Sequence, residues 1–461
     1  MRTTRCASAL AVMGVLGLGG CTAPSRSEKP DARPDARRAE ERLAAHVTAQ
    51  DASSLAETQR ERDDFAQKAL TFLRAEGETR PIRYDAKDFL LEIGDKERNT
   101  VFLSNFFDEY RASAPGQREA VLARLAQVRS APAMPTAFAE VQPHLMPVVR
   151  GRTFFERLRL EVKGRKELAA SLSWRPLGAI LGVGVAFDGP ETLRYLGPDE
   201  FRHWGISFED ALALALDNLR QRSAEPLETL SPGTCQGPWR DTYASSRVLL
   251  DEVVRRCAVK GDPVVLVPHR DLLLITGSDD EDGLRRVADV ALDALLAPRA
   301  LDGRALRLTS SGWAPFMPER LNEAWTDFRK LELFTRARDY DEQTRQLEKH
   351  YQERGEDVFV AAFSPYQDDQ GRGLGYAVWQ RGTPTLLPRA DLIFFMDSSQ
   401  GERAPPVAVA RWEDVASVSP ALRTPVEGLY PERYLVRDYP SEEQLDRWRE
   451  DPGDLFDDAG R

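Results

Sequence analysis

Two continuous apolar runs on either side of a short polar break constrain the fold of this chain most strongly. Val264-Val265-Leu266-Val267 and Leu272-Leu273-Leu274-Ile275 flank Pro268-His269-Arg270-Asp271. Runs of this length and composition predict two buried strands joined by a turn. Apolar residues at helical spacing predict amphipathic helices at 206–221, 247–257 and 284–296. The combination predicts an α+β fold with a mixed sheet and packed helices in the central domain.

The composition narrows the class of protein. The chain has 461 residues, of which 42% are apolar and 30% charged. These values describe a globular protein and exclude a multi-span membrane protein, collagen and wholesale disorder. The formal net charge is −11, with 63 Lys and Arg against 74 Asp and Glu. Because such a chain repels phosphate backbones and shows no basic face, we expect no nucleic-acid partner.

The N-terminus has the pattern of an export signal. Arg2 and Arg5 precede an apolar run at 7–18, which ends in Leu18-Gly19-Gly20-Cys21. A bilayer span needs about 20 apolar residues, so this shorter run with positive charge in front predicts a signal peptide. Leu-Gly-Gly-Cys resembles the lipobox of bacterial lipoproteins. The resemblance implies cleavage before Cys21 and lipidation of its thiol and amine, which would anchor the chain in the membrane.

An ordinary secretory signal, in which Cys21 is incidental, is the alternative. Thr22 follows the cysteine where Asp would favour retention in the inner membrane, so by analogy the outer membrane of the cell envelope is favoured. Removal of Arg2 and Arg5 takes the charge from −11 to −13.

The remaining chain divides by composition. The Pro-Asp-Ala-Arg-like segment after Cys21 has no large apolar residue and predicts a tether, and a helix is expected to run to about Arg74. The predicted parts are a signal peptide at 1–20, a tether at 21–50, an α+β domain at 51–320, a helical connector at 321–355, a smaller strand-rich C-terminal domain at 356–440 and a frayed acidic tail at 441–461.

Two cysteines are left after export, since Cys6 leaves with the signal and Cys21 is lipidated. Cys235 and Cys257 in an exported chain predict a disulfide, which requires Cα atoms within about 7 Å. Two separate buried thiols are the alternative.

Four segments of the central region resemble blocks of the YtpP-like bacterial family, number 1444 among domains of unknown function. The blocks are Pro147–Arg150 with Phe154, Tyr195–Arg220, Asp241–Glu252 and Val267–Leu273. The resemblance covers about 250 residues and implies a similar fold without an established activity. The lipoprotein signal, the tether and the C-terminal extension depart from the family pattern.

The C-terminal region contains an echo of the central turn. Pro388-Arg389-Ala390-Asp391 precedes an apolar run in the same way as Pro268-His269-Arg270-Asp271. An internal duplication would explain the echo, but Pro-x-x-Asp is also an ordinary turn signature.

Catalytic motifs are sparse. The sequence has no G-x-x-x-x-G-K-[ST], H-E-x-x-H, G-x-S-x-G or C-x-x-C pattern. His269 and Asp271 are the candidate catalytic pair, since a carboxylate can orient an imidazole for acid–base chemistry. A structural turn is the alternative: Asp271 then bonds backbone amides, and His269 has no second titratable partner.

A degraded calcium-loop pattern follows the second apolar run. Ser278, Asp280 and Asp282 alternate before Gly283, and Asp289 occupies the twelfth position. An EF-hand needs an entering helix and an apolar eighth position, whereas here a strand precedes and Arg285 occupies that position. Capping of the following helix explains the acidic residues more simply.

Two classes of function remain. The first is a non-catalytic envelope lipoprotein, a binding or assembly module with a protein or peptide partner and no cofactor. The second is an enzyme of unrecognised type, such as a hydrolase, that uses His269 and Asp271. The absence of motifs and the scattered histidines favour the first.

Overall fold

The computed structural model forms two compact units, one of Gln59–Thr335 and one that contains the described residues from Arg336 onward. The described residues are 51–86, 89–94, 99–129, 134–156, 172–190, 193–367, 372–397, 399 and 405–450. The predicted signal peptide and tether therefore lie outside the described residues.

The first unit begins with a small helical and sheet layer. Its elements are α2 (Asp51–Ala75), β1 (Ile82–Asp85), β2 (Leu90–Ile93), β3 (Asn99–Phe102), α3 (Ser104–Ala112) and α4 (Arg118–Arg129). The three strands pair in chain order and are antiparallel. Phe65 of α2 packs against Phe89 and Phe107, with ring centroids 6.5 and 5.6 Å away. The helix expected to end near Arg74 ends at Ala75.

A second sheet is built around one long strand. Its elements are β4 (Leu145–Gly151), β5 (Trp174–Leu177), β6 (Leu181–Asp188) and β7 (Leu193–Tyr195), preceded by α5 (Phe138–Val141). β6 pairs with β4 on one edge and with β5 and β7 on the other, always antiparallel. A Cβ on Gly182 would lie 2.5 Å from the ring of Phe155, so glycine allows the ring to pack directly on the strand.

Helix α8 (Phe208–Gln221), which follows α7 (Pro198–Trp204), packs on this second sheet. Ser207 is its N-cap: the Asp210 amide donates to Ser207 Oγ at 3.0 Å, and the Asp210 carboxylate accepts from the Ser207 amide. The reciprocal bonds satisfy backbone donors that the first turn leaves free.

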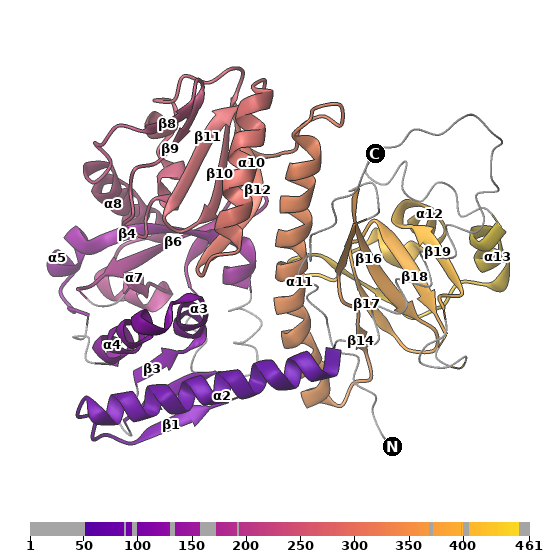
Figure 1. The fold of residues 1–461 in the computed structure, drawn as a ribbon, viewed down its shortest axis with the longest axis horizontal. Helices are drawn as coiled ribbons and strands as arrows, with labels where there is room; N and C mark the ends of the chain where they lie inside the picture. Colours follow the sequence, from indigo (N-terminus) through magenta and orange to yellow (C-terminus); the bar gives the residue numbers. More distant parts are fainter. Residues whose placement is uncertain are drawn as a thin grey trace. The chain divides into compact units, whose positions relative to one another are not determined.

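The two apolar runs form neighbouring strands, as predicted. β10 (Pro263–His269) and β11 (Leu272–Gly277) pair antiparallel at the centre of a six-stranded sheet. The sheet order is β13 (Gly312–Phe316), β12 (Ala300–Thr309), β10, β11, β9 (Thr234–Gln236), β8 (Glu228–Ser231). Helix α10 (Glu281–Leu295) packs on β10, β11 and β12 and places Leu284, Val287 and Ala291 in their core (Figure 1).

The helix predicted at 247–257 is not continuous. The chain forms a 3₁₀ helix at Ser245–Leu249 and a short α-helix, α9, at Asp251–Val254. Leu250 separates them with non-helical backbone angles, φ −103° and ψ 89°. Arg247 lies in the 3₁₀ segment with its side chain fully buried, so tertiary bonds override the helical periodicity there.

Helix α11 (Trp325–Arg354) occupies most of the predicted connector and continues from the first unit into the second. The second unit is strand-rich, as predicted, and contains β14 (Phe359–Val360), β15 (Ser364–Gln367), β16 (Gly373–Gln380), β17 (Thr385–Pro388), β18 (Leu392–Met396), β19 (Ala408–Arg411), α12 (Trp412–Val418), β20 (Arg433–Val436) and α13 (Glu442–Glu450).

The α+β class is confirmed, and the strand directions refine it. Every strand pair of the two central sheets is antiparallel. Mixed sheets occur in the second unit, where β16 pairs parallel with β18 and β14 pairs parallel with β17. β16 reaches β18 only after the chain has crossed to β17 in another sheet.

The acidic tail is not frayed at its start. Glu442–Glu450 forms α13, in which Leu445 is fully buried. Trp448 stacks on Phe395 with centroids 5.0 Å apart and an interplanar angle of 6°. Burial of these two apolar residues, three apart on one helix face, stabilises α13 despite the surrounding acidic residues. The rest of the tail, 451–461, lies outside the described residues.

The echo of the central turn does not produce a second hairpin. β17 and β18 belong to different sheets, whereas β10 and β11 pair with each other. Asp391 accepts a hydrogen bond from the Gly375 amide and donates its own N–H to the Gly375 carbonyl at 2.8 Å. The second Pro-x-x-Asp is therefore an ordinary turn that is fixed by different partners.

Within the described residues, no helix has both the length and the apolar character needed to cross a bilayer.

Candidate ligand site at the Pro268–Asp271 turn

Both ring nitrogens of His269 bond the backbone. Nε2 lies 2.7 Å from the carbonyl oxygen of Pro298, and Nδ1 lies 3.1 Å from the amide nitrogen of Asp271. The carbonyl can only accept and the amide can only donate, so the ring is neutral with its proton on Nε2. The imidazole thus ties the end of β10 to the loop between α10 and β12.

Asp271 acts mainly through the backbone. Its Oδ1 accepts a hydrogen bond of 2.6 Å from the amide of Thr242. Its Oδ2 is 3.9 Å from Nδ1 of His269, longer than the 3 Å separation expected of an acid–base pair. The predicted backbone bond of Asp271 is present, although its partner is in a loop 29 residues earlier.

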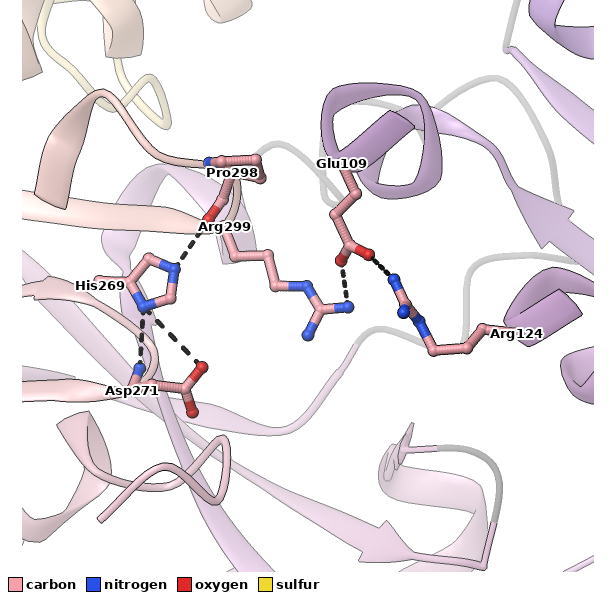
Figure 2. A pocket seen from close by; sticks show the side chains of 6 residues that line it. All are labelled: Glu109, Arg124, His269, Asp271, Pro298 and Arg299. Atoms are coloured by element: carbon pink, nitrogen blue, oxygen red, sulfur yellow. Dashed lines mark hydrogen bonds and ion pairs between the residues drawn. The ribbon is translucent and has the colours of Figure 1, made fainter. Parts of the chain in front are cut away.

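An open pocket of about 460 Å³ lies beside this turn. Its lining residues are Glu109, Arg124, His269, Asp271, Pro298 and Arg299. Figure 2 shows Arg299 extending toward Glu109, whose carboxylate also pairs with Arg124 from α4. Arg299 has a left-handed backbone with φ 67°, which is unusual for a residue with a side chain. The bond from His269 to the preceding carbonyl helps to hold this conformation.

Two arginines at or near the turn have buried nitrogens without a hydrogen-bond partner. Arg150 is 2% exposed; its Nη1 donates to the carbonyl of Val149 at 2.7 Å, but Nε and Nη2 have no hydrogen-bond partner. Nε of Arg270 is also buried and has no partner. Burial, followed by the positive charges of Arg150 and Arg299, lowers the pKa of Arg270 to about 10, against the opposing effect of Tyr195 and Asp271.

Arg247 is buried in a different way. Its guanidinium makes two parallel bonds to the Asp241 carboxylate, at 2.9 and 2.7 Å, and further bonds to Ser223 Oγ and the Arg222 carbonyl. It also stacks over the ring of Trp239 at 4.1 Å. Every nitrogen of the guanidinium has a hydrogen-bond partner, so Arg247 is a structural link and not a candidate for ligand binding.

Three of the four segments quoted for the family resemblance meet around the turn. The amide of Val149 donates to Ser246 Oγ at 3.1 Å, and the amide of Ser245 donates to the carbonyl of Arg270 at 3.0 Å. The Thr242–Asp271 bond is the third connection. The turn is therefore fixed by segments far apart in the sequence.

The cysteine pair has the predicted geometry. Cys235 in β9 and Cys257 after α9 are at disulfide-bond distance, with Cα atoms 6.1 Å apart. Both side chains are buried in the core beneath β11. The link joins β9, the strand next to the edge strand β8, to the segment that follows Arg247. Cys21 lies outside the described residues.

The acidic residues of the calcium-like pattern do not form a binding loop. Asp280 is buried and bonds Lys260 Nζ at 3.2 Å, whereas Asp282 and Asp289 are exposed on α10. Asp280 is the N-cap residue of α10, but its side chain makes no capping hydrogen bond, contrary to the expected capping role. No group of three potential ligands among the described residues could hold a metal ion.

The sequence did not single out the unpaired arginines. Arg150 and Arg270 each follow an apolar strand segment in the blocks that carry the resemblance, and this is the one signal that could have identified them. The lack of a carboxylate partner is a property of three-dimensional contacts.

No protein-family model matches this chain, and searches of curated proteins and of solved structures return no match. The resemblance to the YtpP-like family therefore remains a prediction from the residues quoted above.

Proposed function

We propose that this protein is a bacterial envelope lipoprotein whose YtpP-like α+β body is a non-catalytic binding or assembly module. The lipobox-like sequence before Cys21 supports anchoring, with the outer membrane favoured. The Cys235–Cys257 pair supports an exported location, because disulfides persist in oxidising compartments.

The hydrogen bonding of His269 is the observation that supports a non-catalytic role. Its two nitrogens are each bonded to a backbone group, so neither is directed at a reacting atom. A general acid or base must reach the proton that it transfers, directly or through one water. The imidazole instead braces the wall of a charged pocket, an arrangement suited to binding.

The open pocket beside His269 and Asp271 is the observation that favours the enzyme alternative. Complementation of a deletion strain distinguishes the two functions, with envelope integrity measured as sensitivity to detergent. We expect His269→Gln to restore integrity, since the amide group of Gln can still donate toward the Pro298 carbonyl. We expect the same of Asp271→Asn, which retains an acceptor for the Thr242 amide.

Loss of complementation by His269→Gln, with normal abundance, export and melting temperature, would favour the enzyme. A partner protein that purifies equally with the wild type and with His269→Gln would support the binding module.

A further inference from the structure

Two arginines near the turn have buried nitrogens without the partners that burial normally requires: Arg150 is 2% exposed, and Arg270 is partly exposed with a buried Nε. No ion pair joins Arg150 or Arg270 to a carboxylate of the described residues, and three of their nitrogens lack any hydrogen bond. An unpaired buried charge costs several kcal/mol. Their mutual repulsion adds to this cost, because each positive charge opposes the other. A protein retains such an arrangement when a ligand offsets the cost.

Two other buried arginines of this protein have only a structural role. Arg433 of β20 is fully buried without a carboxylate, and its guanidinium bonds Gln343 Oε1, Thr344 Oγ1 and the carbonyls of Ala361 and Leu386. Arg247 is satisfied by Asp241 and its neighbours. Arg150 and Arg270 therefore differ from the structural arginines in having donors left over.

The surroundings of these donors are positively charged in an acidic protein. Arg124, Arg150, Arg270 and Arg299 oppose Glu109 and Asp271, which leaves two positive charges uncompensated. Arg299 lines the open pocket, and Arg270 lies within electrostatic range of both Arg299 and Arg150. His269 and Asp271, the neighbours of Arg270 in the chain, line the same pocket.

His269 positions this charge. Its Nε2 holds the Pro298 carbonyl, and the next residue, Arg299, has φ 67° and directs its side chain into the pocket (Figure 2). A backbone conformation of this kind is strained for a residue with a side chain and persists where neighbouring contacts impose it.

We propose that Arg270, Arg299 and the buried Arg150 form a binding site for a phosphate group, and this assignment rests on the proposed binding role. Phosphate carries a charge of about −1.5 to −2 at pH 7, which matches the uncompensated positive charge. Guanidinium groups present paired donors that fit its oxygens. The ring of the half-buried Tyr195 lies 5.8 Å from the guanidinium carbon of Arg150 and must shift to expose its inner nitrogens.

Calorimetric titration of the full-length protein in detergent tests the proposal. The probes are inorganic phosphate, glycerol 3-phosphate and succinate, each at the same ionic strength set with sodium chloride. We expect phosphate binding that weakens at least tenfold in Arg270→Gln and in Arg299→Gln. Arg202→Gln is the matched control, because Arg202 is 74% exposed on α7 and pairs with Asp199.

Thermal unfolding provides a second measurement. In chloride, we expect Arg270→Gln to melt at the same temperature as the wild type or higher, because repulsion between guanidinium groups is relieved. In phosphate, the wild type gains stability by binding and the order reverses. The variant also corrects for the general stabilising effect of phosphate on proteins.

Equal phosphate affinity or equal phosphate-induced stabilisation of the wild type and Arg270→Gln would overturn the proposal. Tighter binding of succinate than of phosphate would also overturn it. Tighter binding of glycerol 3-phosphate than of inorganic phosphate would support it and identify the ligand as a phosphate ester. If phosphate binds while His269→Gln fails to complement, the non-catalytic role is lost and the phosphate site stands.

Discussion

The carboxylate of Asp271 accepts a 2.6 Å hydrogen bond from the amide of Thr242, a residue with a left-handed φ of 69°. This bond joins the β10–β11 turn to the loop before Arg247. Asp271→Ala leaves the amide without its acceptor, and we expect a loss of about 1–3 kcal/mol in the free energy of unfolding. Urea denaturation measures it. Asp271→Asn should lose less, and equal losses for both variants would contradict the acceptor role.

The cysteine pair closes a short loop, with a sequence separation of 22 residues. Restriction of the unfolded chain by such a loop stabilises the native state by about 3 kcal/mol. We expect the double variant Cys235→Ala, Cys257→Ala to lose an amount of this order in chemical denaturation. Reduction of the wild type should produce a similar loss. Two free thiols, by mass, in protein purified from the envelope would exclude the disulfide.

Lipidation at Cys21 predicts the location of the protein. Two or three acyl chains hold a protein at a membrane, since each buried CH₂ contributes about 0.8 kcal/mol. We expect Cys21→Ala to block lipid attachment and cleavage by the lipoprotein peptidase. Fractionation and the mass of the mature N-terminus measure both effects. An unchanged N-terminal mass together with an unchanged distribution would show that Cys21 is not the anchor.

The parts of the fold that local patterns determine could be predicted from the sequence. The apolar runs at β10 and β11 and the Ser207 cap are encoded by neighbouring residues. Strand direction could not be predicted in the same way, because it depends on which distant strands become neighbours. The helix expected at 247–257 failed for a related reason, since the bonds of Arg247 to distant groups decide its backbone.

The candidate site was only partly predictable. His269 and Asp271 stand out as a polar break between apolar runs, and both line the pocket. Arg150 looks like any charged residue at a strand end, and only the absence of a nearby carboxylate sets it apart. The absence of a nearby carboxylate can be recognised only when the positions of many chain segments are known.

The N-cap of α8 predicts a pH dependence of stability. Hydrogen bonds from Ser207 lower the pKa of Asp210, through the side-chain hydroxyl first and the backbone amide second. The carboxylate therefore contributes stability above its unfolded-state pKa, and that contribution is lost as pH falls through the folded-state pKa. We expect Asp210→Asn to be less stable than the wild type near pH 6 and equal to it once the carboxyl is protonated. A stability difference that persists unchanged into strong acid would contradict this linkage.

A comparison of Asp241 with Asp199 tests how burial changes the contribution of an ion pair to the free energy of unfolding. Asp241 pairs with Arg247, whose side chain is 0% exposed, whereas Asp199 pairs with Arg202 on the surface of α7. Asp241→Ala leaves a buried guanidinium without its carboxylate, so we expect a loss of about 3 kcal/mol. Asp199→Ala should change stability by no more than about 0.5 kcal/mol, because water screens the exposed pair. Urea denaturation of both variants checks the contrast. The double variant Asp241→Ala, Arg247→Met should recover part of the loss, because it removes the unpaired charge. A double variant that is less stable than Asp241→Ala alone would contradict this expectation. It would show that packing of the guanidinium on Trp239 contributes more than charge pairing.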